Sequence, residues 1–146
     1  MSKHKKALPM KKMVYIFLLL AAISCAPSAN EERKKLYNEV IEIHDEVMPR
    51  MDEIFSLQST VKSQIDSLRK IDTTLQQIEM LKGLHLKLEE ADQAMMNWMR
   101  AFKVSMNSDE VDQQEAIHYF EAEREKIIEV RDVMNRNIDE AQQKLK

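Results

Sequence analysis

Glycine, proline, cysteine and aromatic residues are all scarce in this sequence. Among its 146 residues there are one Gly, three Pro and one Cys, and aromatic residues make up only 5%. So few turn-forming residues exclude a sandwich, a barrel or an α/β fold built from many short elements. A single cysteine excludes a framework of disulfides within the chain. What remains is one small domain, rich in charged residues (32%) and in apolar residues at helical spacing.

Charge is distributed unevenly along the chain. The first 24 residues contain five lysines and no acidic residue, whereas the sequence from Cys25 onward has 17 Lys and Arg against 25 Asp and Glu, a net charge of −8. Nucleic-acid binding needs a basic face. The acidic body therefore predicts no nucleic-acid partner.

The N-terminus has the pattern of an export signal. Residues 1–12 are basic and residues 13–23 form an 11-residue apolar run. This run is shorter than the ~20 apolar residues of a bilayer span, but it is typical of a secretory signal. The tetrapeptide Ala22-Ile23-Ser24-Cys25 ends the run and resembles the bacterial lipobox, with Ala22 in place of the commoner Leu.

That resemblance implies cleavage before Cys25 and acylation of both its thiol and its new amine. Several acyl chains hold a protein firmly, because each buried CH₂ adds ~0.8 kcal/mol. Ala26, where such lipoproteins have Asp for retention in the inner membrane, implies the outer membrane. We therefore expect a signal peptide over 1–24 and a lipidated Cys25 with a short tether over 25–30. The alternatives are an ordinary secretory signal with an incidental cysteine, and a short membrane anchor that stays attached.

The first helix of the body is expected to follow the tether. Ser28 and Glu31 have the spacing of a capping box, and Pro49 predicts a kink because it removes one backbone hydrogen bond. Two adjacent apolar ridges indicate contact with two neighbouring helices. The first ridge is Leu36, Val40, Ile43, Val47, Ile54, Leu57, Val61 and Leu68, and the second is Tyr37, Ile41, His44, Met48, Met51 and Phe55.

Two further helices complete the body. The first turn is expected at Lys70–Thr74, where Asp72 or Thr73 could cap the next helix, with Gly83 as a competing break. The second turn and the N-cap of the helix after it are expected at Asn107–Asp109. The second helix carries Leu81, Leu84, Leu88, Met95, Met99, Phe102 and Met106, and the third carries Ala116, Phe120, Ile127, Val130, Met134, Ile138, Ala141 and Leu145. The sequence predicts an all-α fold, an elongated antiparallel three-helix bundle over residues 31–146.

The predicted hairpin sets which residues of the first two helices face each other. A turn near residue 71 brings residue i opposite roughly residue 142 − i, so Arg50 faces Asp92 and His44 faces Trp98. Arg50 and Asp92 both interrupt apolar seams, where an unpaired charge is costly, and they are predicted to form a structural ion pair. The alternative makes Asp92 a ligand or an acid–base group.

Soft metal-ligating side chains gather at the level of His44. Imidazole and thioether groups select Cu(I), and the candidate Cu(I) ligands are His44, Met48, Met51, Met96 and Met99, with Met95 at the same level. Methionine is also a flexible packer of irregular cores, and packing is the interpretation that the sequence favours. His85 is expected to be partly buried and His118 to be exposed, which weakens any site made of three histidines.

Enzyme motifs are absent from the sequence. It contains no Gly-rich phosphate loop, no CxxC, no HExxH and no GxSxG. We therefore expect a protein that is not an enzyme and that has no cofactor besides the covalent lipid on Cys25.

The segments EVIEIHDEVMPRMDEI (39–54) and ADQAMMNWMR (91–100) resemble a group of small Gram-negative bacterial lipoproteins labelled "viral A-type inclusion protein". The resemblance covers most of the body and implies an exported helical lipoprotein without an assigned activity. We expect a non-enzymatic envelope lipoprotein, held at the membrane by its lipid and acting as a structural or protein-interaction module with a protein partner in the envelope. The alternatives are a soft-metal binding or sensing lipoprotein and a self-associating coiled coil.

Overall fold

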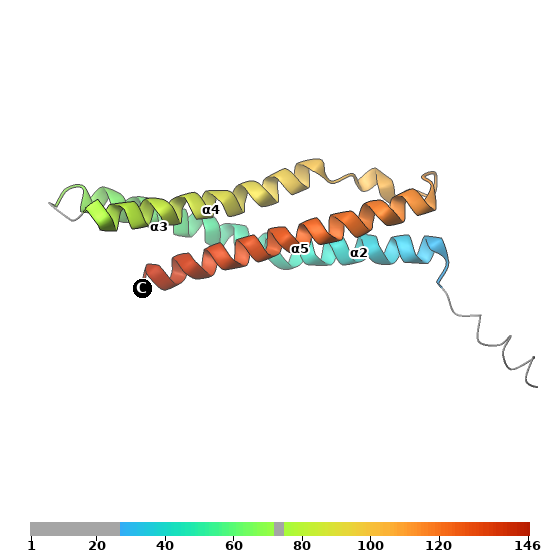
Figure 1. Cartoon of the computed structure of the whole chain (residues 1–146), viewed down its shortest axis with the longest axis horizontal. Coiled ribbons are helices and arrows are strands. Elements are labelled where there is room, and N and C mark those ends of the chain that lie inside the picture. The colour runs from blue at the N-terminus through green and yellow to red at the C-terminus, as the bar shows by residue number, and fades with distance from the viewer. Residues whose placement is uncertain (1–26, 72–74) are drawn as a thin grey trace, which may run out of the picture.

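The computed structural model describes residues 27–71 and 75–146, and in these two ranges all regular structure is helical. Three long helical segments lie side by side (Figure 1), which confirms the predicted all-α bundle. In chain order the elements are α2 (Ala29–Val47), η2 (Met48–Arg50), α3 (Met51–Leu68), α4 (Leu75–Ala101), η3 (Val104–Asn107) and α5 (Gln113–Lys144).

The chain runs up, down and up again. Arg124 bonds to Glu39 and Arg50 bonds to Asn135, so α2 and α5 keep a constant offset of 85 residues and run parallel. Between them in sequence, α4 runs in the opposite direction. α5 packs mainly on α2 and α4, whereas α3 packs mainly on α4. Figure 1 shows this change of neighbour, since the α3–α4 pair extends past the C-terminal end of α5.

The start of α2 and the bend after it follow the sequence signals. Ser28 accepts a hydrogen bond from the backbone N–H of Glu31, whose carboxylate in turn accepts from the backbone N–H of Ser28. This capping box was predicted and is confirmed. Pro49 lies in the short 3₁₀ turn η2 between α2 and α3, where its missing N–H interrupts the α-helical hydrogen bonding. The predicted kink is therefore confirmed.

Two adjoining clusters make up the core. The larger one runs along all three helical segments and includes the fully buried Val40, Ile54, Leu88 and Met95. The smaller one lies at the end where α2 begins and contains Leu36, Ala116, Ile117 and Phe120. Most of both predicted apolar ridges is buried or half-buried. Phe55 is the exception, because after the bend its side chain points outward and is 51% exposed.

The first interhelical connection was predicted in about the right place. α3 ends at Leu68 and α4 begins at Leu75, while the candidate caps Asp72 and Thr73 lie outside the described residues. Gly83 does not break α4, which passes through it as a continuous helix.

The second connection differs from the sequence prediction. α4 ends at Ala101 rather than continuing through Met106, and the N-cap of α5 is Asp112 rather than a residue of 107–109. An aromatic contact explains the early end. The Phe102 ring stacks on Trp98 at 4.9 Å, and the Lys103 N–H leaves the helix to donate to the Tyr119 hydroxyl at 2.7 Å. Tertiary packing therefore overrides the local helical periodicity.

Candidate interaction sites

The predicted ion pair between Arg50 and Asp92 is wrong. The Arg50 Nε lies 3.2 Å from Glu53, its Nη2 lies 3.4 Å from Asp139, and its Nη1 donates to Asn135. At the bend, Arg50 therefore points to α5 and not to α4. Burial works against the charge of the guanidinium, but the hydrogen bonds and charges of Glu53 and Asp139 outweigh it and raise the pKa of Arg50.

His44 contacts Trp98, as the predicted register of the first two helices indicates. The two ring centroids are 5.6 Å apart with an interplanar angle of 31°. The other partner of the imidazole is a carboxylate, since His44 Nδ1 lies 2.8 Å from Asp45. The imidazole of His44 thus lies between the indole ring of Trp98 and the exposed carboxylate of Asp45.

A surface groove opens beside the Pro49 bend, between the α2–α3 segment and α4. It has a volume of about 550 Å³ and is lined by Asp45, Met48, Pro49, Met51, Asp52, Phe55 and Met96. We call it the methionine groove. Its base includes the buried Met51, and its wall includes Phe55 and Met96, which are 51% and 42% exposed. Apolar surface is thus open to a partner, and the carboxylates of Asp45 and Asp52 line the same groove.

The structure brings together only part of the candidate Cu(I) set. Met48, Met51 and Met96 line the methionine groove, whereas His44 and Met99 do not. Met99 instead packs against the main core. In residues 27–71 and 75–146 no three His, Cys, Asp or Glu side chains are grouped so that they could hold a metal ion. Of the other histidines, His85 is half-buried and His118 is 70% exposed in its side chain, as predicted.

A second groove lies between α4 and α5 and has a volume of about 440 Å³. We call it the α4–α5 groove. Its apolar floor comes from Trp98, Ala94, Ala101, Val130 and Val133, and its polar residues are Glu90, Asn97, Glu123, Lys126 and Glu129. Of these polar side chains only Glu123 is buried, with 3% of the residue exposed.

The burial of Glu123 is not evident from its immediate neighbours, because acidic residues alternate with Arg and Lys over 121–126 and this pattern is typical of a solvated face. The signal was nonetheless present. Phe120 and Ile127 lie on the buried stripe of α5, and Glu123 fills the position between them at a spacing of three and four residues. A carboxylate at that position has to be buried. Asn137, near the end of the same stripe, is also buried, and its Nδ2 donates to the Lys87 carbonyl at 2.7 Å.

The two carboxylate oxygens of Glu123 have different surroundings. Oε1 accepts from the Lys126 ammonium at 2.7 Å, and this hydrogen bond raises the pKa of Lys126. Oε2 is buried and has no hydrogen-bond partner in the described part of the chain. Close by, burial of Tyr119 is the main cause of its raised pKa, to which the charge of Glu123 adds.

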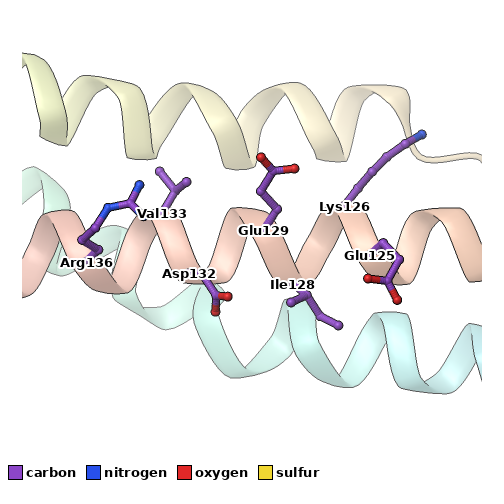
Figure 2. Close-up of a pocket in the computed structure, with 7 residues that line it drawn as sticks. All are labelled: Glu125, Lys126, Ile128, Glu129, Asp132, Val133 and Arg136. Atoms are coloured by element: carbon purple, nitrogen blue, oxygen red, sulfur yellow. The ribbon is translucent and has the colours of Figure 1, made fainter.

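A third depression, of about 540 Å³, runs along α5 alone. Figure 2 shows that all seven residues lining it project from this one helix, with Lys126, Glu129 and Val133 on the side of α4. Its carboxylates and bases alternate at helical spacing, which is typical of a solvated helix face. We assign it no chemistry of its own.

The end of the bundle where α2 begins is fastened by a buried arginine. The Arg33 side chain is 1% exposed, and its Nη2 donates to the exposed Asp109 at 2.7 Å, which ties α2 to the connection before α5. The hydrogen bond from Arg33 and the guanidinium charge lower the pKa of Asp109. Cys25, the predicted lipidation site, lies outside the described residues. None of the described helices is long and apolar enough to cross a bilayer.

Comparison of the chain with protein-family models, with curated proteins and with solved structures found no match. Its function is therefore inferred from its own residues.

Proposed function

We propose that this protein is a lipid-anchored component of a bacterial cell envelope, held by acyl chains on Cys25 and acting as a structural or protein-interaction module rather than as an enzyme. The basic residues 1–12, the short apolar run 13–23 and the small residues before Cys25 support the anchor. The resemblance to small Gram-negative lipoproteins supports export, and Ala26 favours the outer membrane. Several acyl chains on one residue supply the stable attachment that one chain cannot.

The observation that carries the proposal is the start of α2 at Ala29, immediately after its cap Ser28. Three residues lie between Cys25 and Ala29, and the four steps along the chain from one to the other reach at most about 14 Å when fully extended. Acyl chains on Cys25 would hold the Arg33–Asp109 end of the bundle close to the bilayer. Since α4 alone has 27 residues, the other end would project by about 40 Å.

The methionine groove is the surface that we assign to the protein partner. Methionine adapts its shape to a partner, and Met48 and Met96 both line the groove beside the exposed Phe55. Asp45 and Asp52 add negative charge to it. This chemistry fits a protein segment that presents an apolar side chain together with nearby basic residues.

The anchor is tested by Cys25→Ser expressed in a Gram-negative host. Incorporation of labelled palmitate and recovery in the detergent-soluble membrane fraction are expected for the natural sequence and are expected to be lost in the variant. A variant that still takes up label and remains with the membranes would contradict the anchor.

The groove is tested by a photo-crosslinking residue at position 55. Leu86 is the matched control, because it is an exposed apolar residue (64%) that does not line the methionine groove. A discrete cross-linked product is expected from position 55 and not from position 86, and it is expected to disappear with Asp52→Lys. Equal products from both positions would contradict the assignment.

Binding of Cu(I) is the second candidate function, and one observation favours it: Met48, Met51 and Met96 line a single groove. A ligand at ~100 times its Kd stabilises the folded state by ~2.7 kcal/mol. If Cu(I) binds there, the melting temperature of the full-length chain rises by the corresponding amount with Cu(I), and Met96→Leu abolishes the rise. Met80→Leu is the control, since Met80 is 38% exposed and does not line this groove. An unchanged melting temperature in the presence of Cu(I) contradicts this candidate.

A further inference from the structure

The three methionines that line the methionine groove differ in exposure. Met51 is buried, Met48 is half-buried, and Met96 is 42% exposed. Met96 also directly follows Met95, which is fully buried, on α4. The oxidation of a thioether depends on the access of the oxidant to its sulfur. Met96 is therefore the methionine of this groove that an oxidant in solution reaches first.

The groove offers hydrogen-bond acceptors but no side-chain donor. Its lining residues are three methionines, two aspartates, one proline and one phenylalanine, and none of these side chains carries an N–H or O–H when the aspartates are ionised. Methionine sulfoxide adds one more acceptor, a strongly polar S=O oxygen. An apolar side chain that covers this oxygen removes it from water without supplying a donor, which weakens binding. A basic residue of the partner pairs more strongly with Asp45 or Asp52 than with a neutral sulfoxide.

Hydrogen peroxide is an oxidant that suits this groove. It is uncharged, so Asp45 and Asp52 do not repel it as they repel an anionic oxidant. The lone pair of the Met96 sulfur attacks one oxygen of the peroxide, and the S–O bond forms as the O–O bond breaks. The hydroxide that leaves takes the proton from the new S–OH group and departs as water. The sulfur thus loses two electrons to the peroxide, and sulfoxide reductases reverse the change.

We propose that Met96 is a reversible oxidation site, at which hydrogen peroxide forms the sulfoxide and so weakens the binding of the protein partner in the methionine groove. This inference rests on the function proposed above for the groove. Both states keep the fold, because Met96 lies outside the two clusters that make up the core.

The first measurement identifies the oxidised residue. The full-length chain in detergent is treated with hydrogen peroxide, and the tryptic peptide 88–100, which contains Met95, Met96 and Met99, is followed by tandem mass spectrometry. Sulfoxide is expected at Met96 while Met95 is still reduced, with an unchanged far-UV circular dichroism spectrum. Equal oxidation of Met95 and Met96 in the folded chain, or a Met96 that stays reduced, would overturn the proposal.

The second measurement follows binding. The full-length chain with the photo-crosslinking residue at position 55 is oxidised, freed of peroxide, and mixed with the detergent-solubilised envelope of the Gram-negative host. The cross-linked product is expected to fall about tenfold, as for a polar group covered without a donor, and to return after treatment with methionine sulfoxide reductases. A product that oxidation does not change overturns this inference alone. The absence of any product from the unoxidised chain contradicts the assignment of the groove to a partner, and this inference with it.

Variants assign the effect to Met96. Met96→Leu cannot form a sulfoxide, so the amount of its product is expected to be the same before and after oxidation. Met80→Leu is the matched control, because Met80 is on the same helix, is 38% exposed and does not line the methionine groove. Its product is expected to fall on oxidation as it does without the substitution. Met96→Gln places a polar oxygen in the groove without an oxidant and is expected to lower the product, whereas Met80→Gln is not. Protection by Met80→Leu, or an undiminished effect of oxidation on Met96→Leu, would overturn the proposal.

Discussion

Met95 and Met96 are adjacent on α4 but differ in burial. Truncation of each therefore compares the stability contributed by a packed methionine with that contributed by an exposed one. Met95 is fully buried in the main core, whereas Met96 is 42% exposed in the methionine groove. Truncation of Met95 to alanine removes three buried groups at ~0.8 kcal/mol each and leaves a cavity, which together give a loss of about 3–4 kcal/mol in the free energy of unfolding. Met96→Ala is expected to cost about 1 kcal/mol or less, because part of the side chain is already in water and no closed cavity forms.

The assay is urea unfolding of the full-length chain, followed by far-UV circular dichroism. The two variants are matched controls for each other, since the substitution and the helix are the same and the change in helix propensity cancels. A loss of 3 kcal/mol corresponds to a fall of roughly 10 °C in Tm for a domain of this size. Equal losses for the two variants, or a larger loss for Met96→Ala, would refute the assignment of Met95 to the core and of Met96 to the groove.

Three further predictions concern polar groups. Asp112 caps α5 by accepting from two backbone N–H groups at 3.0 Å, so Asp112→Ala is expected to lower the free energy of unfolding by about 1 kcal/mol in urea titrations, and a loss near zero would argue against the cap. Because Arg33 lowers the pKa of Asp109 in the folded state, the contribution of Asp109 is present above its unfolded pKa and is lost as pH falls through its folded pKa. Asp109→Asn should therefore destabilise the protein at neutral pH but not in acid, and a pH-independent difference between the two melting curves would contradict the pair. Asn137→Ala should cost about 1 kcal/mol, because it removes the hydrogen bond from the buried Asn137 side chain to the Lys87 carbonyl; unchanged stability would exclude the bond.

Local signals in the sequence predicted the features that depend on local chemistry. The capping box of Ser28 and Glu31 needs only residues three apart, and the bend at Pro49 needs only a missing N–H. The contact between His44 and Trp98 was also predicted, because the two helices that carry these residues are joined by a short turn. Antiparallel neighbours joined in this way have a register that the length of the turn determines.

Contacts between the first and the third helix could not be predicted from local signals in the sequence. Arg50 was paired with Asp92 because only consecutive helices were aligned, whereas the structure places it against Asp139 and Asn135 of α5, 85 or more residues away. The side of a bent helix that faces a non-consecutive neighbour depends on the direction of the bend. Pro49 marks the position of the bend, but nothing in the local sequence fixes its direction.

The α4–α5 groove was missed for a related reason. Glu123 lies in a run of alternating charges, and that pattern is typical of a solvated face. Glu123 is nonetheless buried, because it lies between Phe120 and Ile127 on the buried stripe of α5. Similarly, the end of α4 at Ala101 depends on the Tyr119 hydroxyl, which accepts from Lys103 across 16 residues.

Attachment through Cys25 is tested most directly by the mass of the N-terminal peptide of the protein isolated from the membranes of a Gram-negative host. If the protein is anchored as proposed, this peptide begins at Cys25 and carries a diacylglyceryl group on Sγ and an acyl chain on the α-amine. A peptide that retains residues 1–24, or one that begins elsewhere and contains Cys25 with a free thiol, would contradict it.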